Sequence, residues 1–192
     1  MRQSRFNAKF MAQGAIIAAM YAALTILFAP ISYGAVQVRI SEAFTILPLF
    51  TPAAIPGLFI GCLLANILGG AIVWDIIFGS IATLIGAAGG YLLRFNRWLV
   101  PIPAIVSNSI IIPLILKYGY SIEMSLWLLI VYIAIGEIIS CYLLGELLAT
   151  AILKRGDLRG IFSHEGKKAK SSLKEEYHDF EDDHHDEYDR DL

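Results

Sequence analysis

Histidine is missing from the first 163 residues of this 192-residue chain, and all four histidines fall near the carboxyl end. There are only two cysteines, Cys62 and Cys141, and each lies inside an apolar run without metal-ligand spacing. Metal sites and proteolytic sites draw mostly on His, Cys and paired acids that face one another. These absences argue against a membrane-embedded enzyme or a metalloprotein, and we expect both thiols to be free and structural.

Two further absences concern transport. The sequence contains no Gly-x-x-x-x-Gly-Lys-Ser/Thr loop, so the chain cannot hydrolyse ATP by itself. It also shows no second copy of its hydropathy pattern, whereas secondary transporters are commonly built from paired repeats with the substrate between them. A chain of this kind that moved a substrate uphill would need energy from other subunits.

What the chain does have is apolar sequence, with 57% hydrophobic residues and a mean hydropathy of +0.63. Ordinary soluble domains are about 45–50% apolar, so the composition predicts an integral membrane protein. Residues 1–160 carry ten Lys and Arg against six Asp and Glu, whereas residues 161–192 carry five against eleven and hold all four histidines. We expect a membrane domain over residues 1–160 and a disordered, acidic cytoplasmic tail over residues 161–192.

Six apolar segments predict an all-α membrane bundle of six helices, because about 20 apolar residues at 1.5 Å each cross a bilayer. The segments are Met11–Ile31, Ser41–Phe50, Ile55–Gly70, Trp74–Leu93, Trp98–Lys117 and Ile122–Leu153. With six crossings, eight of the ten Lys and Arg in residues 1–160 fall on the side that holds both termini. Positive residues gather on the cytoplasmic side, so both termini are predicted inside, and five crossings would contradict the same rule.

The first predicted helix has a face of small residues. This face consists of Ala15, Ala19 and Ala23 at four-residue spacing, with Gly14, Ala18 and Ala22 beside them. Small residues allow helices to approach closely in lipid, where no hydrophobic effect acts between helices. The face could dock on a partner subunit or pack within the protein's own bundle, and the sequence leaves both alternatives open.

Ionisable residues near or inside the apolar segments are the main candidates for a ligand site, since such groups tend to face a cavity, a partner or a ligand. Arg39 and Glu42 stand three residues apart at the start of the second segment, where they could bind a ligand or pair with each other. Tyr33 and Gln37 precede them and add stacking and hydrogen-bonding capacity. Glu137 lies in the middle of the sixth segment and must face the interior, where it could bind a cationic amine or a purine edge, or hold two helices together.

Other polar residues extend this candidate set. Asn66 lies on a face of small residues and could meet a ligand or another helix. Trp74 and Asp75 stand at the outer start of the fourth segment, where the helix dipole also favours a carboxylate. Asn108 lies between two serines and could instead satisfy carbonyls freed by a proline further along. Glu146, on the opposite face from the buried acid nine residues earlier, is expected to form a cytoplasmic pair or contact a partner.

Four stretches of the sequence together resemble one known family. They are Gln-Val-Arg-Ile-Ser-Glu-Ala (37–43), Leu-Pro-Leu-Phe-Thr-Pro-Ala-Ala-Ile-Pro-Gly (47–57), Gly-Cys-Leu-Leu-Ala-Asn (61–66) and Asp-Ile-Ile-Phe-Gly-Ser (75–80). This composite pattern is similar to the QueT family over residues 10–160, and it is more specific than any of its pieces. The acidic tail after Phe162 is not part of the pattern, so nothing about the tail is carried over.

The resemblance implies a substrate-binding S component of an energy-coupling-factor (ECF) transporter in the bacterial cell membrane. Such a protein has a six-helix fold and a high-affinity site near the external side, here for a queuosine precursor, the aminomethyl-deazaguanine base. The resemblance also implies that the small-residue face of the first helix docks on a transmembrane coupling subunit and that two ATPase subunits supply energy. It calls for the lipid bilayer as surroundings, and for no cofactor, metal or nucleic acid.

This ligand, a guanine-like ring with a primary ammonium group, needs one acceptor for the cation and another for the donor edge of the ring. Candidate acceptors are Glu42, Asp75 and Glu137, candidate readers of the ring edges are Gln37, Asn66 and Asn108, and candidate stacking partners are Tyr33 and Trp74. Arg39 is expected to hold Glu42 or to contact the carbonyl edge. The sequence does not say which carboxylate takes which role.

Two alternatives to this function stay open at the level of sequence. The same kind of S component could carry another vitamin or nucleobase, because a fold does not settle its cargo. The chain could also be a solitary small-molecule transporter, which predicts flux through the chain alone in liposomes.

Overall fold

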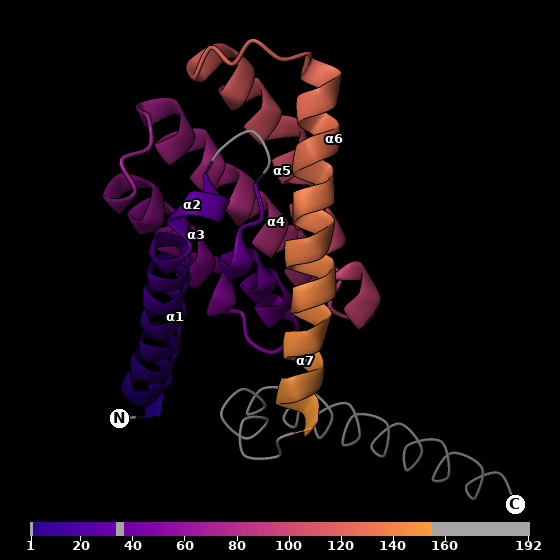
Figure 1. The fold of residues 1–192 in the computed structure, drawn as a ribbon. Helices are drawn as coiled ribbons and strands as arrows, with labels where there is room; N and C mark the ends of the chain where they lie inside the picture. Colours follow the sequence, from indigo (N-terminus) through magenta and orange to yellow (C-terminus); the bar gives the residue numbers. More distant parts are fainter. Residues whose placement is uncertain (1, 34–36, 155–192) are drawn as a thin grey trace, which may run out of the picture. The chain divides into compact units, whose positions relative to one another are not determined.

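The chain folds into a series of helices joined by short connections (Figure 1). The computed structural model describes residues 2–33 and 37–154, with side chains from residue 8 onwards. Every regular element within these ranges is helical. Residues Met1–Ala151 form one compact unit. The acidic tail predicted over residues 161–192 lies outside the described residues, so that assignment stays a prediction.

The helices follow one another with short connections. The α-helices are α1 (Arg2–Leu27), α2 (Ala29–Ser32), α3 (Ala54–Leu68), α4 (Ser80–Leu92), α5 (Ile102–Leu114), α6 (Leu126–Glu137) and α7 (Gly145–Lys154). The 3₁₀ segments are η1 (Ile40–Leu49) and η3 (Arg97–Leu99), and the wider π-type segments are η2 (Asp75–Gly79), η4 (Ile115–Gly119) and η5 (Ile138–Leu144). Each π-type segment continues an adjoining α-helix, so α6, η5 and α7 form one long rod (Figure 1).

Within the described residues, four helical stretches are long and apolar enough to cross a membrane. They are Ala8–Leu27, Asp75–Leu92, Arg97–Gly119 and Leu126–Lys154. The other two predicted segments are helical but shorter, at Ile40–Leu49 and Ala54–Leu68. A 3₁₀ helix rises about 2.0 Å per residue, so η1 reaches about 20 Å, which is less than the hydrocarbon thickness of about 30 Å. Within the described residues, an all-α fold with several helices that could cross a membrane is confirmed, whereas six crossings and two cytoplasmic termini stay predictions.

The short segment η1 lies inside the bundle. All residues from 41 to 48 are buried, and η1 packs against α1, α3, α4 and η5. Irregular backbone is tolerated at membrane depth only where protein rather than lipid surrounds it. This packing accounts for the 3₁₀ geometry of η1 in an apolar protein, and it carries Glu42 into the interior.

Helices α1 and α3 pack closely through small residues. A Cβ atom at Gly57 would lie 2.8 Å from the carbonyl oxygen of Gly14, and a Cβ atom at Gly61 would lie 2.9 Å from the carbonyl oxygen of Ala18. The two backbones are therefore too close for a side chain at either α3 position. Part of the small-residue face predicted on the first helix packs within the protein's own bundle, as one of the two alternatives for it proposed.

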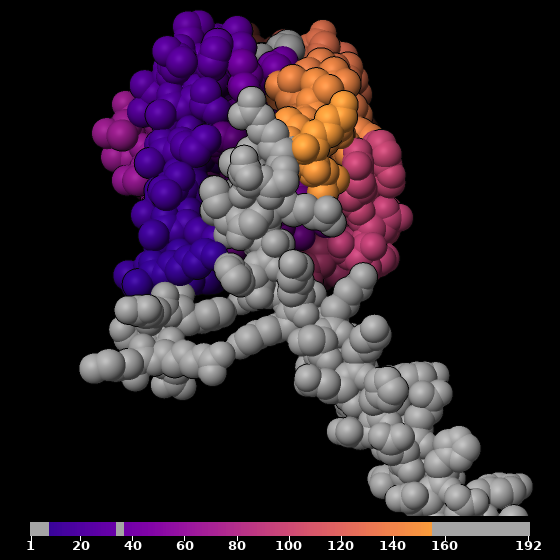
Figure 2. Space-filling view, turned by 90° about the horizontal axis from the view of Figure 1, so that it is seen from below, coloured from indigo at the N-terminus to yellow at the C-terminus, as the bar shows by residue number. Residues whose placement is uncertain are grey.

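The remaining part of that face looks outward. Ala15, Ala19 and Ala23 are exposed, and so are the neighbouring side chains of Ile16 and Met20. Figure 2 shows α1 at the outer edge of the molecule when it is seen from below. The two alternatives therefore apply to different residues of one helix, and the three alanines are available to lipid or to a partner.

Glu146 on α7 is held by an ion pair with η3. Arg97 Nη2 lies 2.8 Å from Glu146 Oε2, and Arg97 Nε donates to the same oxygen at 3.0 Å. Arg97 also donates to Thr150 Oγ1 at 3.3 Å. The expectation that Glu146 has a pairing role is confirmed, and the carboxylate joins α7 to the start of the helical stretch Arg97–Gly119.

Candidate functional site

Most of the predicted ligand-site residues are buried in the apolar bundle. The buried ones are Gln37, Arg39, Glu42, Asn66, Asp75, Asn108 and Glu137. Tyr33 is partly buried, and its hydroxyl donates to the carbonyl of Ala65 at 2.9 Å. Burying a polar or charged group is costly unless it is hydrogen-bonded or paired, so the partners of these groups decide what they can do.

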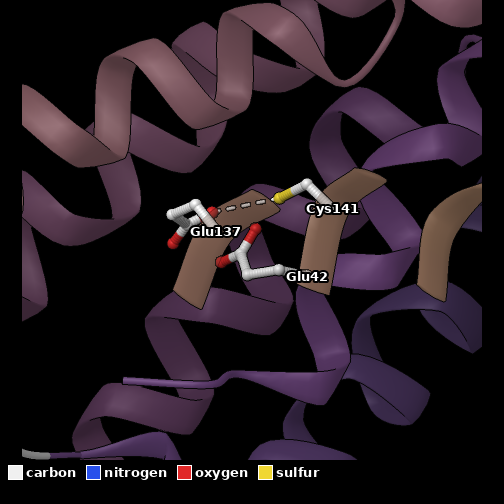
Figure 3. Close-up of side chains that lie close together, drawn as sticks. All are labelled: Glu42, Glu137 and Cys141. Atoms are coloured by element: carbon white, nitrogen blue, oxygen red, sulfur yellow. Dashed lines mark hydrogen bonds between the residues drawn. The ribbon is translucent and has the colours of Figure 1, made fainter. Parts of the chain in front are cut away.

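Two carboxylates approach each other in one part of this interior (Figure 3). Glu42 comes from η1 and Glu137 from the end of α6, and their side chains are 1% and 8% exposed. Cys141 on η5 donates to Glu137 Oε2 at 3.0 Å, and the donor and acceptor atoms of the three residues all lie within 4.8 Å of one another. The carboxylate of Glu42 points toward the other two side chains (Figure 3). These three residues are called the acidic cluster, and their spacing suits one small cation.

Each carboxylate of the acidic cluster also has a neutral partner. Tyr21 on α1 donates its hydroxyl to Glu42 Oε1, and the amide of Asn108 on α5 hydrogen-bonds to Glu137. Among the described residues, Glu42 Oε2 has no hydrogen-bond partner. A buried acceptor without a partner carries the full cost of its desolvation. This oxygen therefore marks a position where a ligand donor would be stabilised.

Arg39 lies near Glu42, but within the described residues the two side chains form no direct ion pair, which was the alternative to a ligand site. Its Nε makes a long contact with the carbonyl of Ser32 at 3.5 Å, and its Nη1 lies 3.9 Å from Cys62 Sγ. The guanidinium also lies over the Tyr33 ring, 5.3 Å from the ring centroid. Arg39 Nη2 is buried without a hydrogen-bond partner in the described part of the chain. It can therefore donate to a ligand acceptor.

A second polar group, called the Asp75 cluster, consists of Asn66 on α3, Asp75 on η2 and Tyr120. Asn66 Nδ2 donates to the backbone carbonyl of Asp75 at 3.1 Å, and Tyr120 donates its hydroxyl to Asp75 Oδ2 at 3.2 Å. Within residues 37–154, Asn66 Oδ1 and Asp75 Oδ1 are buried and have no hydrogen-bond partner. Asn66 Nδ2 also lies 3.7 Å from Cys62 Sγ, which Arg39 contacts from its other side. The cluster thus holds two available acceptors close to an available donor.

The segment that carries Gln37 and Arg39 rests on a glycine of α6. A Cβ atom at Gly136 would overlap with the carbonyl oxygen of Gln37. Only a residue without a side chain allows this approach. Because Gly136 directly precedes Glu137, the contact brings the segment beside the acidic cluster.

Trp74 is a predicted site residue that does not lie among the buried site residues. Its side chain is 59% exposed and stacks on Phe78 with ring centroids 5.8 Å apart. Both rings line an exposed apolar groove of about 490 Å³, together with residues of α5 and η4. An exposed tryptophan at a helix end is typical of the interface between a membrane and water.

Sequence reasoning did not include four residues that contact the predicted site residues. They are Tyr21, Cys62, Tyr120 and Cys141. A hydroxyl group in the middle of an apolar helix was the available signal for Tyr21. The sequence gives no signal that a cysteine belongs to the site, because a cysteine in an apolar run can either pack only or also donate a hydrogen bond.

Comparison with known sequences decides the family. The sequence profile of a family described as "QueT transporter" matches residues 11–154. The chain belongs to the QueT transporter family. The match includes α1 from residue 11 onwards and every later helix, so each residue of the two clusters lies within the QueT region. A transporter family agrees with the expectation that the protein is not an enzyme.

A curated QueT relative gives a partial match. The chain is 38% identical over 87 residues to the queuosine precursor transporter QueT of Lactococcus lactis subsp. cremoris. This match covers 44% of the present chain and 50% of the relative, so it spans about half the length of that protein. No solved structure matches the chain.

Proposed function

We propose that this protein captures a queuosine precursor, the aminomethyl-deazaguanine base, outside the cell and delivers it inward as the S component of an ECF-type importer. The QueT family and the name of the curated relative support the cargo. The observation that carries the proposal is a set of buried polar atoms that lack partners among the described residues. Four of them belong to predicted site residues, and these are Arg39 Nη2, Glu42 Oε2, Asn66 Oδ1 and Asp75 Oδ1; Ser109 Oγ, Ser140 Oγ and Glu146 Oε1 are unpaired in the same way. A polar ligand would supply partners for the four site atoms.

The ring of such a ligand fits the Asp75 cluster and Arg39. A guanine-like ring presents a carbonyl acceptor beside an edge of N–H donors. In the proposed complex, Asp75 Oδ1 and Asn66 Oδ1 accept from the donor edge, and Arg39 Nη2 donates to the carbonyl. Tyr33, which already lies against the Arg39 guanidinium, stacks on the ring face. Gln37, two residues before Arg39 on the same segment, helps to read the ring edge in the proposed complex.

Delivery needs partners, because the sequence holds no ATP-binding loop. We propose that Ala15, Ala19 and Ala23 dock on a transmembrane coupling subunit that two ATPase subunits drive. The three alanines are exposed on α1, and exposed small residues let a partner helix approach closely in lipid. Both termini face the cytoplasm in this arrangement.

Calorimetric titration of the purified full-length protein tests the cargo. We expect tight binding of the aminomethyl-deazaguanine base, weaker binding of guanine, and no binding of an unrelated vitamin. A folded sample that binds neither purine would contradict the proposed cargo. Uptake by the chain alone in liposomes, without coupling subunits and ATP, would contradict its role as an S component.

The contact between Gly136 and Gln37 leads to a prediction about binding. Gly136→Ala is expected to lower ligand affinity at least about tenfold, because overpacking typically costs 1–3 kcal/mol and the segment with Arg39 must move off α6. Gly145→Ala is the matched control on the same rod, since a Cβ atom there meets the Ala43 carbonyl oxygen at an ordinary 3.4 Å. Titration of both variants checks the prediction, and equal affinities would contradict it.

A further inference from the structure

We infer that the acidic cluster is the subsite for a primary ammonium group on the ligand, with Glu42 and Glu137 as the groups that select a cation. This inference rests on the proposed function and deepens it, because it divides the polar interior into a cation subsite and a ring subsite. Glu42 and Glu137 come from different helices and point at one small region, together with the thiol of Cys141 (Figure 3).

The charges around the acidic cluster leave a place for one more cation. Its charged or titratable neighbours are Tyr21 from α1, Arg39 from the segment before η1, and Cys62 from α3. Arg39 is the cation among these described neighbours, and its guanidinium contacts Cys62 and the Tyr33 ring. Two buried carboxylates close together repel each other when both are charged. A ligand cation placed between them removes that repulsion.

The number of acceptors suits an ammonium group. A primary ammonium has three N–H donors. Glu42 Oε2 is without a partner in the described part of the chain, and each carboxylate oxygen of Glu137 has two lone pairs, of which the bond from Cys141 uses one on Oε2. Three charge-assisted hydrogen bonds can therefore form at one position.

A zinc ion is a poorer match to the same residues. Structural zinc sites are tetrahedral and are usually built from Cys and His, whereas the cluster offers one thiol and two carboxylates, and residues 1–163 contain no histidine. The thiol of Cys141 donates a hydrogen bond to Glu137 Oε2. The arrangement favours an organic cation over a metal ion.

The inference also gives Arg39 a place that does not conflict with a cationic ligand. Its Nη1 contacts Cys62, and Cys62 in turn contacts Asn66 of the Asp75 cluster. The guanidinium thus belongs with the ring subsite, while the two glutamates hold the ammonium. A ligand bound across both subsites has a preferred orientation, because its ring carbonyl needs the donor that Arg39 Nη2 supplies at the ring subsite.

The experiment compares the aminomethyl ligand with a neutral analogue in which a cyano group replaces the aminomethyl group. Calorimetry is carried out on the full-length protein and on the variants Glu42→Gln, Glu137→Gln and Glu146→Gln. The neutral analogue is expected to bind the unmodified protein about 10- to 150-fold more weakly than the aminomethyl ligand, the factor that corresponds to hydrogen bonds with charged groups. Each cluster variant is expected to lose a similar factor for the aminomethyl ligand and to bind the neutral analogue as before. Glu146→Gln, which alters the distant pair with Arg97, is expected to change neither affinity.

Three results would overturn the inference. Equal binding of the two ligands by the unmodified protein would overturn it. This result needs no variant, so it holds even if a variant fails to fold. It would not contradict the proposed cargo. An equal loss for both ligands in the cluster variants would assign the glutamates to the ring or to the fold. Stoichiometric binding of Zn²⁺ alone that Cys141→Ser abolishes would make the cluster a metal centre. Failure of both ligands to bind is a separate outcome that contradicts the proposed function itself.

Discussion

Asp75→Asn is expected to lower the affinity for guanine-like ligands by about 100-fold, whether or not the ligand carries an ammonium group. The carboxylate is 3% exposed, and its Oδ1 has no hydrogen-bond partner within the described residues. An amide has nearly the same shape, but it has one acceptor oxygen fewer and no charge for the donor edge of the ring. Hydrogen bonds to charged groups contribute about 1.5–3 kcal/mol each, and 1.4 kcal/mol is a factor of ten in affinity.

A neighbouring variant separates loss of the ring contact from general damage to the Asp75 cluster. Tyr120→Phe removes the hydroxyl that donates to Asp75 Oδ2 and leaves the carboxylate in place. Its effect on affinity is expected to be less than about tenfold, the size of one ordinary hydrogen bond. Calorimetry with guanine and with the aminomethyl base checks both variants, and thermal unfolding confirms that they are folded. Native affinity in Asp75→Asn would remove this residue from the ring subsite.

Ala19→Leu is expected to reduce uptake to the level seen without coupling subunits, while ligand affinity stays unchanged. Ala19 lies at the centre of the exposed alanine face of α1, where a leucine would hold a partner helix away from the backbone. The ligand groups lie in the interior on other helices or on the inner face of α1, as Tyr21 does. We therefore expect the substitution to affect transport and not binding.

The measurement is ATP-dependent uptake into liposomes that contain the protein with its coupling and ATPase subunits, followed by calorimetry on the isolated variant. Ala151→Leu provides the matched control, since it makes the same change at an exposed position of α7. Its uptake is expected to be native, because added apolar surface facing lipid carries little cost. Normal uptake in Ala19→Leu would show that α1 is not the docking face.

The helix boundaries could be predicted because apolar runs end at proline, glycine or charge. The segment predicted at Ile55–Gly70 corresponds to α3 at Ala54–Leu68, and the one at Trp98–Lys117 corresponds to the helical stretch Arg97–Gly119. The type of helix could not be predicted in the same way. Whether a turn is 3₁₀, α or π depends on what packs around it, and η1 is enclosed by helices that come before and after it in the chain.

The site could be predicted in its residues more than in its contacts. Charge in an apolar segment is costly, so the sequence predicted that Glu137 faces the interior, and for Glu42 it predicted only a cavity, a partner or a ligand beside it. The hydrogen bond from Tyr21 to Glu42 could not be predicted from sequence, because it depends on the rotation of α1 about its axis. The close approach at Gly61 sets that rotation, and it turns Ala18 inward while the next residue faces out. Such pairings between helices leave no trace in a hydropathy pattern.

The burial of η1 along residues 41–48 insulates the ligand groups from the physical state of the surrounding lipid. A lipid-facing helix that is too short for its membrane must be matched by tilting, by local thinning or by reorganisation of its neighbours. Since protein surrounds η1, the length of η1 need not match the thickness of the acyl-chain layer. A change of acyl chain length acts first on the four longer helical stretches. Glu42 is thereby anchored to the protein's own interior rather than to the depth of the bilayer. A tilt of the whole bundle in the membrane would leave these buried polar groups at the same distances from one another.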